Sequence, residues 1–337
     1  MAWMIAGCAF VSTWILLKLF INKAEQFGFV DTPNKRSIHT KPVPRGGGIV
    51  FGIVFFFCLS LIEPHYFSNH TSVLFAIAMI YIVGILDDHQ DTTPRTKFIV
   101  LAIAILLSIY GHVIIDDVGA YAGVDIRLEW LALPFTLFAL AGFTNAFNLI
   151  DGLDGLAASV GIVILSAIAW IGYIHNDQFI VHTAILVIMI LLAFLTYNKP
   201  PAKVFMGDSG SLFTGFVIAV LATYTLQYIS GAAILFLAAV PLLDTFFVMY
   251  RRKRDGRPLM QADRCHIHHI LFRHFKGNIY KTIGVLLLLQ IINALLGIYV
   301  VTHIDGILGL VLFGGIFVVT YRWMQHLLQK YGIVCYM

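Results

Sequence analysis

The chain has 337 residues, of which 59% are hydrophobic and only 12% are charged. A soluble globular chain is nearer half apolar and a quarter charged, and a disordered chain has the opposite bias, so the composition excludes both classes and predicts a polytopic integral membrane protein. The modest formal net charge of +4 gives no reason to expect nucleic acid as a partner.

Apolar runs recur along the whole sequence. Since a membrane-spanning helix needs about 20 mostly apolar residues, we expect about eleven transmembrane helices in an all-α fold, with residues 1–337 forming one domain. The predicted spans are 1–21, 46–63, 72–86, 98–115, 130–148, 156–174, 180–197, 211–229, 232–250, 282–302 and 307–322.

The basic residues predict the orientation of these spans. If the spans alternate in direction, every Lys and Arg except Arg127 falls in loops or at span ends on one side. The positive-inside rule makes that side cytoplasmic, which places the N-terminus outside and the C-terminus in the cytoplasm.

The predicted cytoplasmic loops also hold nearly all the unusual polar clusters. The acidic pair Asp116 and Asp117, in a predicted outer loop, is not part of a motif with basic residues or glycines. We therefore expect the active site to be formed by cytoplasmic loops, namely 22–45, 87–97, 149–155, 198–210 and 251–281.

The first cluster directly follows the apolar run 72–86. It contains Asp87, Asp88 and Asp91, of which Asp91 can share a helix face with either of the others. Carboxylates at the mouth of a span are costly unless they are paired or bind a cation, and this set suits Mg²⁺ bridging to phosphate. A solvated acidic helix end is the alternative interpretation.

The second cluster runs from residue 145 to residue 155. Asn148, Asp151 and Asp154 recur every three residues and can line one face, while Gly152 and Gly155 allow close approach of a ligand. Capping of the helix that starts near Leu156 could explain one carboxylate but not the other.

The third cluster, residues 207–211, reads Gly-Asp-Ser-Gly-Ser before another span. It resembles the nucleophile loop of trypsin-like proteases, but the membrane context rules that function out. Asp208 is better interpreted as a metal ligand, with amides at a helix start that bind phosphate. Helix capping by Asp208 or Ser209 is the alternative.

The fourth cluster combines Arg264 with His266, His268 and His269, and residues 267–275 could form a short amphipathic helix. Because no second ligand cluster accompanies the histidines, substrate binding is favoured over zinc, and a solvated loop is a third option. Asp244, inside a span, either pairs with a basic residue or faces the bundle interior.

The four cysteines are not spaced as in a disulfide-bonded framework, and free thiols are expected for Cys8, Cys58, Cys265 and Cys335.

The four polar clusters together supply oxygen ligands for a hard cation, amides and cations for phosphate, and histidines for a polar group. A soluble phosphorylated donor that meets a lipid phosphate acceptor needs such a site, since phosphoryl transfer depends on positioning and charge neutralisation.

These motifs resemble those of the polyprenyl-phosphate N-acetylhexosamine-1-phosphate transferase family, over nearly the whole chain. The resemblance rests on residues 31–39 with Pro44 to Gly48, and on the four clusters described above. The His-Ile-His-His sequence and Asp91 resemble the undecaprenyl-phosphate N-acetylglucosamine-1-phosphate transferase branch rather than the peptidoglycan translocase.

The resemblance implies a reaction and its participants. UDP-N-acetylglucosamine would be the donor and undecaprenyl phosphate the acceptor, in the first membrane step of a cell-envelope polysaccharide such as O-antigen, common antigen or teichoic acid. The enzyme would act in the bacterial plasma (inner) membrane, facing the cytoplasm, and would use Mg²⁺, for which Mn²⁺ can substitute. Homodimers occur in the family.

The resemblance also implies residue roles. Asp208 would bind the metal with Asn148, Asp87 would act as base or orienting carboxylate with Asp88 beside it, and Lys97 would neutralise phosphate charge. The substrate-binding residues would be Asp91, Asn145, Asp151, Asp154, Arg264, His266, His268 and His269.

Other functions remain open from the sequence. A different UDP-N-acetylaminosugar would use the same reaction, and a membrane prenyltransferase would also use two acidic Mg²⁺ motifs, although it leaves residues 207–211 and the histidines unexplained. A transporter is disfavoured, because transporters place charges near the bilayer midplane and only Asp244 is clearly there.

Overall fold

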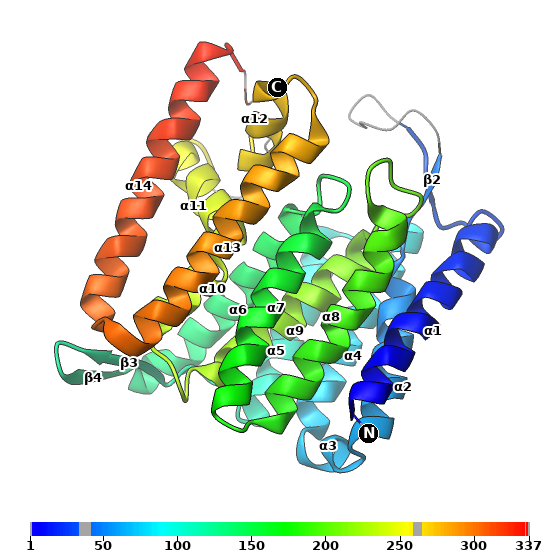
Figure 1. Ribbon diagram of the computed structural model, residues 1–337, viewed down its shortest axis with the longest axis horizontal. Coiled ribbons are helices and arrows are strands. Elements are labelled where there is room, and N and C mark those ends of the chain that lie inside the picture. The colour runs from blue at the N-terminus through cyan, green and yellow to red at the C-terminus, as the bar shows by residue number, and fades with distance from the viewer. Residues whose placement is uncertain (1, 34–41, 259–264, 334, 336–337) are drawn as a thin grey trace. The chain divides into compact units, whose positions relative to one another are not determined.

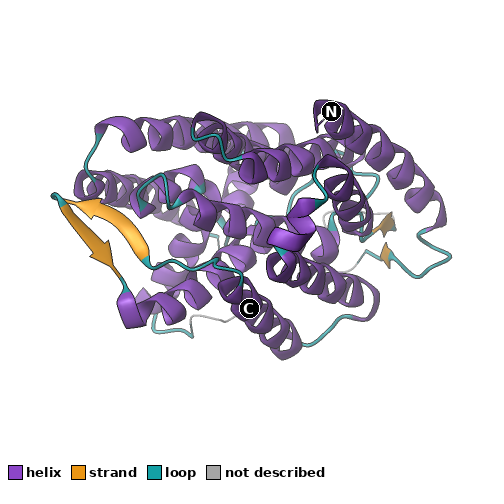
Figure 2. Cartoon of the chain, turned by 90° about the horizontal axis from the view of Figure 1, so that it is seen from below, coloured by secondary structure: helices purple, strands orange, loops and turns teal. Residues whose placement is uncertain are grey.

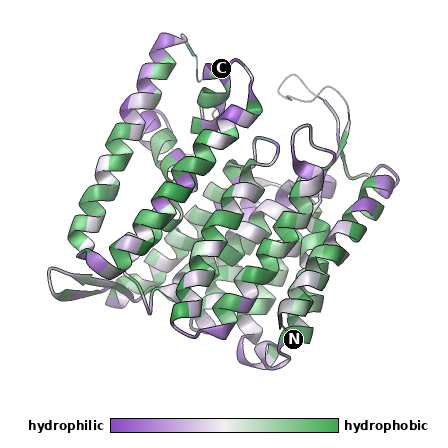
Figure 3. Cartoon of the chain, in the orientation of Figure 1, coloured by the Kyte–Doolittle hydropathy of each residue, from purple (hydrophilic) through white to green (hydrophobic). Residues whose placement is uncertain are grey.

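The computed structural model describes residues 2–33, 42–258, 265–333 and 335, and it is mostly helical. The chain divides into two compact units. The first contains residues 1–117 and 127–228, and the second contains residues 118–126 and 229–337. Figure 1 shows the helices as long rods, and Figure 3 shows apolar residues along the rods with polar residues concentrated at their ends.

The described residues of the first unit form a bundle of long helices and one short β-ribbon. In the ribbon, Val30 pairs with Pro44 and Asp31 with Val43, antiparallel. Its elements are α1 (Ala2–Lys23), β1 (Val30–Asp31), β2 (Val43–Pro44), α2 (Gly48–Ile62), α3 (His65–Asn69), α4 (Thr71–Gln90), α5 (Pro94–Tyr110), the 3-10 turn η1 (Glu129–Leu131), α6 (Ala132–Leu149), α7 (Leu156–Ile174), α8 (Gln178–Asn198) and α9 (Gly207–Thr225).

Helix α9 is the core of this unit. It packs against α2, α4, α6, α7 and α8, and almost all of its residues are buried. A helix that is apolar on every side has to be enclosed, and α9 is enclosed by protein. Its Phe213 ring meets Phe55 and Tyr81 edge-on, with ring centroids 5.3 and 6.1 Å apart. This packing fixes the start of α9, where Gly207 and Asp208 lie.

The described residues of the second unit form a β-hairpin and five helices. Figure 2 shows the hairpin strands in orange. Its elements are β3 (Asp117–Tyr121), β4 (Val124–Arg127), α10 (Gly231–Leu237), α11 (Ala239–Arg254), α12 (Ile267–His274), α13 (Ile279–His303) and α14 (Gly306–Lys330). Helix α12 confirms the short helix predicted for residues 267–275.

Many large apolar side chains of α13 and α14 point outward, among them Leu295 (62% exposed), Val311 (63%) and Val319 (70%). Exposure on this scale is unfavourable in water and is typical of a lipid-facing surface. The described residues include seven helices that are long and apolar enough to cross a membrane, or eight if α10 and α11, bent by 93°, form one broken span. The protein is therefore a polytopic, mostly helical membrane protein.

A helix does lie at each of the eleven predicted spans, with α10 and α11 sharing one of them. Three of these helices fall short of the length or hydropathy of a span: α2 has 15 residues, α5 has 17, and α9 begins with the polar turn at 207–211. Several helix ends differ from the predicted spans by a few residues, and one of these differences affects the acidic residues. Helix α4 continues past residue 86 to Gln90 and ends where Asp91 adopts a left-handed φ of 48°, so Asp87 and Asp88 lie on its last turn and not in a loop.

Candidate active site

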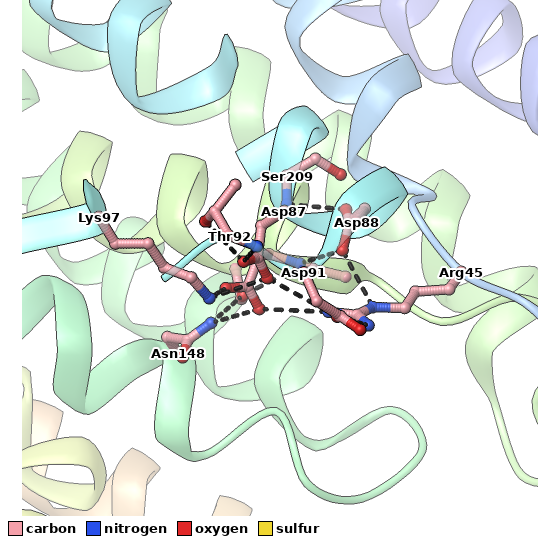
Figure 4. Close-up of polar contacts among 11 residues, drawn as sticks. Arg45, Asp87, Asp88, Asp91, Thr92, Lys97, Asn148 and Ser209 are labelled. Carbon is pink, nitrogen blue, oxygen red and sulfur yellow. Dashed lines mark hydrogen bonds and ion pairs between the residues drawn. The ribbon is translucent and has the colours of Figure 1, made fainter. Parts of the chain in front are cut away.

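Four of the predicted acidic residues of the first unit, Asp87, Asp88, Asp91 and Asp208, meet where α4 ends and α5 and α9 begin (Figure 4). The segment after β2 runs beside the segment before α9, with Gly47 N bonded to Phe205 O at 2.9 Å and Gly48 N to Met206 O at 3.0 Å. This pairing brings Arg45 to the start of α9. Three stretches far apart in sequence, at Arg45, at residues 87–97 and at Asp208, therefore contribute to one cluster.

Asp88 caps α9 from the neighbouring helix. Its Oδ1 accepts a hydrogen bond from Asp208 N at 2.8 Å, and its Oδ2 accepts one from Ser209 N at 2.9 Å. The first amides of a helix lack partners within the helix, so this carboxylate supplies what a local cap would. The alternative predicted for Asp208 and Ser209, that one of them caps α9, is wrong, because neither side chain bonds to the helix start.

Lys97 lies between two carboxylates. Its Nζ is 2.8 Å from Asp87 Oδ2 and 2.6 Å from Asp208 Oδ2. The other oxygen of Asp87 accepts hydrogen bonds from the backbone N and the hydroxyl of Thr92, at 2.9 and 2.8 Å. Asp87 is thus a fully engaged, nearly buried carboxylate.

Arg45 was not predicted as a site residue, yet its guanidinium contacts every carboxylate of the cluster. It lies 3.1 Å from Asp88 Oδ1, 3.4 Å from both Asp87 Oδ2 and Asp91 Oδ1, and 3.9 Å from Asp208 Oδ1. Its side chain is 29% exposed. The sequence signal was its place directly before three glycines, Gly46 to Gly48, which let the backbone turn closely here.

The cluster carries excess negative charge. Four carboxylates, Asp87, Asp88, Asp91 and Asp208, face two cations, Arg45 and Lys97, so four minus two leaves two negative charges uncompensated. Among the described residues, no group of three or more His, Cys, Asp or Glu side chains is arranged as a ready metal cage. Oxygen donors with a net charge of −2 nevertheless fit Mg²⁺, which uses one or two carboxylates plus substrate phosphates.

The structure brings the two predicted metal ligands together. Asn148, on the last turn of α6, donates from Nδ2 to Asp208 Oδ1 at 3.2 Å and to Ser211 Oγ at 2.7 Å. The side chain of Asn145, one turn earlier, forms no hydrogen bond with any described residue. Of the two asparagines, only Asn148 therefore joins the acidic cluster directly.

Asp151 and Asp154 differ in their surroundings. Burial and the negative charges of Asp208, Asp88 and Asp154 raise the pKa of Asp151 well above its ordinary value. Asp154 accepts a hydrogen bond from Ala202 N at 2.9 Å, and the N-cap of α7 is Gly155, without a side-chain bond. The alternative that an aspartate caps α7 is therefore wrong.

Asn198 supports this region and was missed by the sequence analysis. It is buried, accepts from Gly155 N at 2.8 Å and donates to Val204 O at 2.8 Å. It therefore ties the loop before α7 to the loop before α9. Nothing in the local sequence marks it, because both of its partners are backbone groups.

The histidine motif belongs to the second unit and is organised by Asp244. The Oδ2 of Asp244 lies 2.6 Å from His266 Nδ1, and its Oδ1 accepts from Ile267 N at 2.5 Å. Of the two interpretations of Asp244, pairing with a basic side chain holds. Arg264 lies outside the described residues, so its predicted role stays a prediction.

His268 is the unusual member of the motif. It is 2% exposed, and neither ring nitrogen has a hydrogen-bond partner among the described residues. Burial, followed by the charge of His269, whose ring centroid is 4.2 Å away, lowers the pKa of His268 to about 3. A neutral imidazole with two unused nitrogens can both donate and accept a hydrogen bond.

The prediction of free thiols was wrong for two of the four cysteines. Cys265, next to His266, forms a disulfide with Cys335, whereas Cys8 and Cys58 are free. The two bonded cysteines are 70 residues apart, and no spacing rule connects such a pair.

Replacement of Asp88 by Asn should destabilise the protein by about 1–3 kcal/mol, because the new amide group faces a buried backbone N–H that then has no acceptor. Thermal unfolding in detergent would measure this loss. Asp91→Asn is the matched control, since Asp91 belongs to the same motif but its side chain is 89% exposed. Equal melting temperatures for the two variants would contradict the capping role.

Part of the chain matches a known protein family. Residues 70–226, which include most of the acidic cluster, match the model of the family described as Glycosyl transferase family 4. The chain is 36% identical over 255 residues to a probable undecaprenyl-phosphate N-acetylglucosaminyl 1-phosphate transferase of Bacillus subtilis, covering 74% of this chain and 71% of that protein.

Two further relatives are of the same kind. The undecaprenyl-phosphate alpha-N-acetylglucosaminyl 1-phosphate transferase of Escherichia coli K12 is 31% identical over 278 residues, covering 78% of this chain and 74% of its own length. The decaprenyl-phosphate N-acetylglucosaminephosphotransferase of Mycobacterium tuberculosis is 30% identical over 285 residues, covering 74% and 70%. The chain therefore belongs to the polyprenyl-phosphate N-acetylhexosamine-1-phosphate transferases, within glycosyl transferase family 4.

Proposed function

We propose that the protein transfers N-acetylglucosamine-1-phosphate from UDP-N-acetylglucosamine to undecaprenyl phosphate and releases UMP. The observation that carries the proposal is the meeting of Asp87, Asp208, Lys97 and Arg45 at the ends of membrane helices. Relatives that cover about three quarters of the chain are named for this transfer.

The reaction requires one bond to form and one to break. An oxygen of the acceptor phosphate attacks the donor phosphorus that carries the sugar, and the bond from that phosphorus to the bridging oxygen breaks, so that UMP leaves. Both reactants are anions, so the enzyme has to neutralise charge and align them. Lys97 and Arg45 supply fixed positive charge for this purpose.

Mg²⁺ is the proposed cofactor, held by Asp208 and the adjacent Asn148, and when bound it would neutralise the charge of the donor diphosphate. The oxygen donors and the net charge of −2 of the cluster support this assignment. Asp87 orients the acceptor through Lys97. We favour direct attack over a phospho-aspartate, because an acceptor phosphate that is already ionised needs little activation and both oxygens of Asp87 are engaged.

The proposal includes the membrane arrangement of eleven spans, with the N-terminus outside and the acidic cluster at the cytoplasmic face of a bacterial plasma membrane. The distribution of Lys and Arg supports it. Asp151, Asp154 and the histidine motif serve the donor in this scheme, Asp154 by shaping the loop before α9.

A radiolabel transfer assay tests the function. Purified protein, Mg²⁺ and undecaprenyl phosphate would be incubated with sugar-labelled UDP-N-acetylglucosamine or with UDP-N-acetylmuramoyl-pentapeptide. Label should enter the lipid fraction only from the first donor, with release of UMP. Transfer from neither would leave only another UDP-N-acetylaminosugar, and failure of a panel of these would overturn the proposal.

His268→Ala should raise the KM for the donor by about tenfold and leave the KM for the lipid acceptor nearly unchanged, because two hydrogen-bonding nitrogens are lost from a buried position. Initial rates measured against each substrate in turn would show this. An equal change in both KM values would make the assignment of the motif to the donor wrong.

A further inference from the structure

The break between α10 and α11 leaves backbone groups without helical partners inside the second unit. The two helices meet at Ala238 at an angle of 93°. A bend of this size interrupts the hydrogen-bond ladder, and unpaired backbone groups are costly at membrane depth unless another group satisfies them. The partners of these groups therefore determine how α11 is held.

One side chain satisfies both sides of the break. Gln290, on α13, is fully buried. Its Nε2 donates to Leu237 O, the end of α10, at 2.6 Å, and its Oε1 accepts from Val240 N, in the first turn of α11, at 2.9 Å. Both hydrogen-bonding ends of the amide are used, one on each helix.

The first turn of α11 leads directly to Asp244. Asp244 lies four residues after Val240, one helical turn further on, and it holds His266 Nδ1 and Ile267 N. Pro241, between them, has no N–H to satisfy near the helix start. An uninterrupted series of contacts thus runs from Gln290 through α11 and Asp244 to the histidine motif.

We propose that Gln290 is a positioning residue for the reaction: by bridging α10 and α11 it fixes where Asp244 lies and so orients His266. The inference rests on the proposed use of the histidine motif for the donor. It assigns a role to a residue of α13 that lies outside all four polar clusters and contributes no group to substrate.

Asn293 offers a matched control. It lies on the same helix, nearly one turn from Gln290, and is equally buried, but its Nδ2 donates only to Leu289 O of its own helix and its Oδ1 has no partner among the described residues. Gln290→Leu and Asn293→Leu both replace a buried amide by an apolar side chain of similar size. Only the first removes a bridge between two helices.

Steady-state kinetics provides the first test. Gln290→Leu should raise the donor KM by about tenfold and leave the acceptor KM unchanged, whereas Asn293→Leu should change neither. A double variant that combines Gln290→Leu with Asp244→Asn tests the route of this effect. If Gln290 acts through Asp244, the double variant should have the same donor KM as Asp244→Asn alone. The proposal would be overturned if the two leucine variants had equal effects, or if Gln290→Leu changed the donor KM and the acceptor KM equally. It would also be overturned if the increases in donor KM of the two single variants multiplied in the double variant.

A second measurement needs no substrate. His266 is 6% exposed, so its reaction with diethyl pyrocarbonate should be slow in the wild type and in Asn293→Leu. It should be several-fold faster in Gln290→Leu, as followed by peptide mass spectrometry. An unchanged rate would contradict the positioning role even if the wild type transferred no sugar phosphate, so failure of this inference is separable from failure of the proposed function.

Discussion

Replacement of Asp208 by Asn should reduce turnover by about 10²–10³-fold, because it removes a preorganised charge from the reacting centre. Asp208 Oδ2 lies 2.6 Å from Lys97 Nζ, and its Oδ1 accepts from Asn148 at 3.2 Å. An amide would present NH₂ to one of these two donors and so displace it. The sugar-transfer assay, run over a series of Mg²⁺ concentrations, measures both consequences.

The Mg²⁺ series distinguishes a metal ligand from a purely structural carboxylate. If Asp208 holds the ion, the concentration for half-maximal activity should rise along with the loss of turnover. Asp116→Asn is the control, since Asp116 is exposed and lies outside the cluster. Near-normal turnover with an unchanged Mg²⁺ requirement in Asp208→Asn would remove Asp208 from the metal site.

Sequence reasoning succeeded where a short stretch carries its own signal. Asp87, Asp88 and Asp208 are charged residues next to long apolar runs, and their cost in that position indicates a site without further information. The helix at 267–275 was predictable because its amphipathic pattern lies within one segment. Family membership followed from five such local motifs in order.

Sequence reasoning failed where the partner of a residue lies far away along the chain. The role of Asp88 beside Asp87 stays a prediction, but its contacts with the start of α9, which begins more than a hundred residues later, were not foreseen. Gln290 and Asn198 bond to backbone atoms, which have no residue type to recognise. The Cys265–Cys335 pair is similar, since only the fold places the two sulfurs together.

Gly48→Ala should abolish activity and prevent normal folding, although it adds a single methyl group. A Cβ at Gly48 would lie 1.9 Å from Gly210 N and 2.4 Å from Ser209 C, both backbone atoms of α9. Side chains can rotate away from an added methyl, but a helix backbone cannot, so overpacking here should cost more than the ~1–3 kcal/mol of a typical core position. The yield of monodisperse protein and its melting temperature in detergent measure the effect.

Gly142→Ala is the matched control and should have nearly the opposite effect. Gly142 is an exposed glycine of α6, and a Cβ built there has no atom within 4 Å beyond the adjacent residues and backbone of its own helix. Because alanine favours a helix over glycine by about 0.5–1 kcal/mol, this variant should be as stable as the wild type or slightly more so. Comparison of the two variants distinguishes a general intolerance of added methyl groups from an effect of the close packing between α2 and α9. If Gly48→Ala folded and turned over normally, α2 and α9 could separate without moving Asp208, and the packing of α9 would not be what positions the acidic cluster.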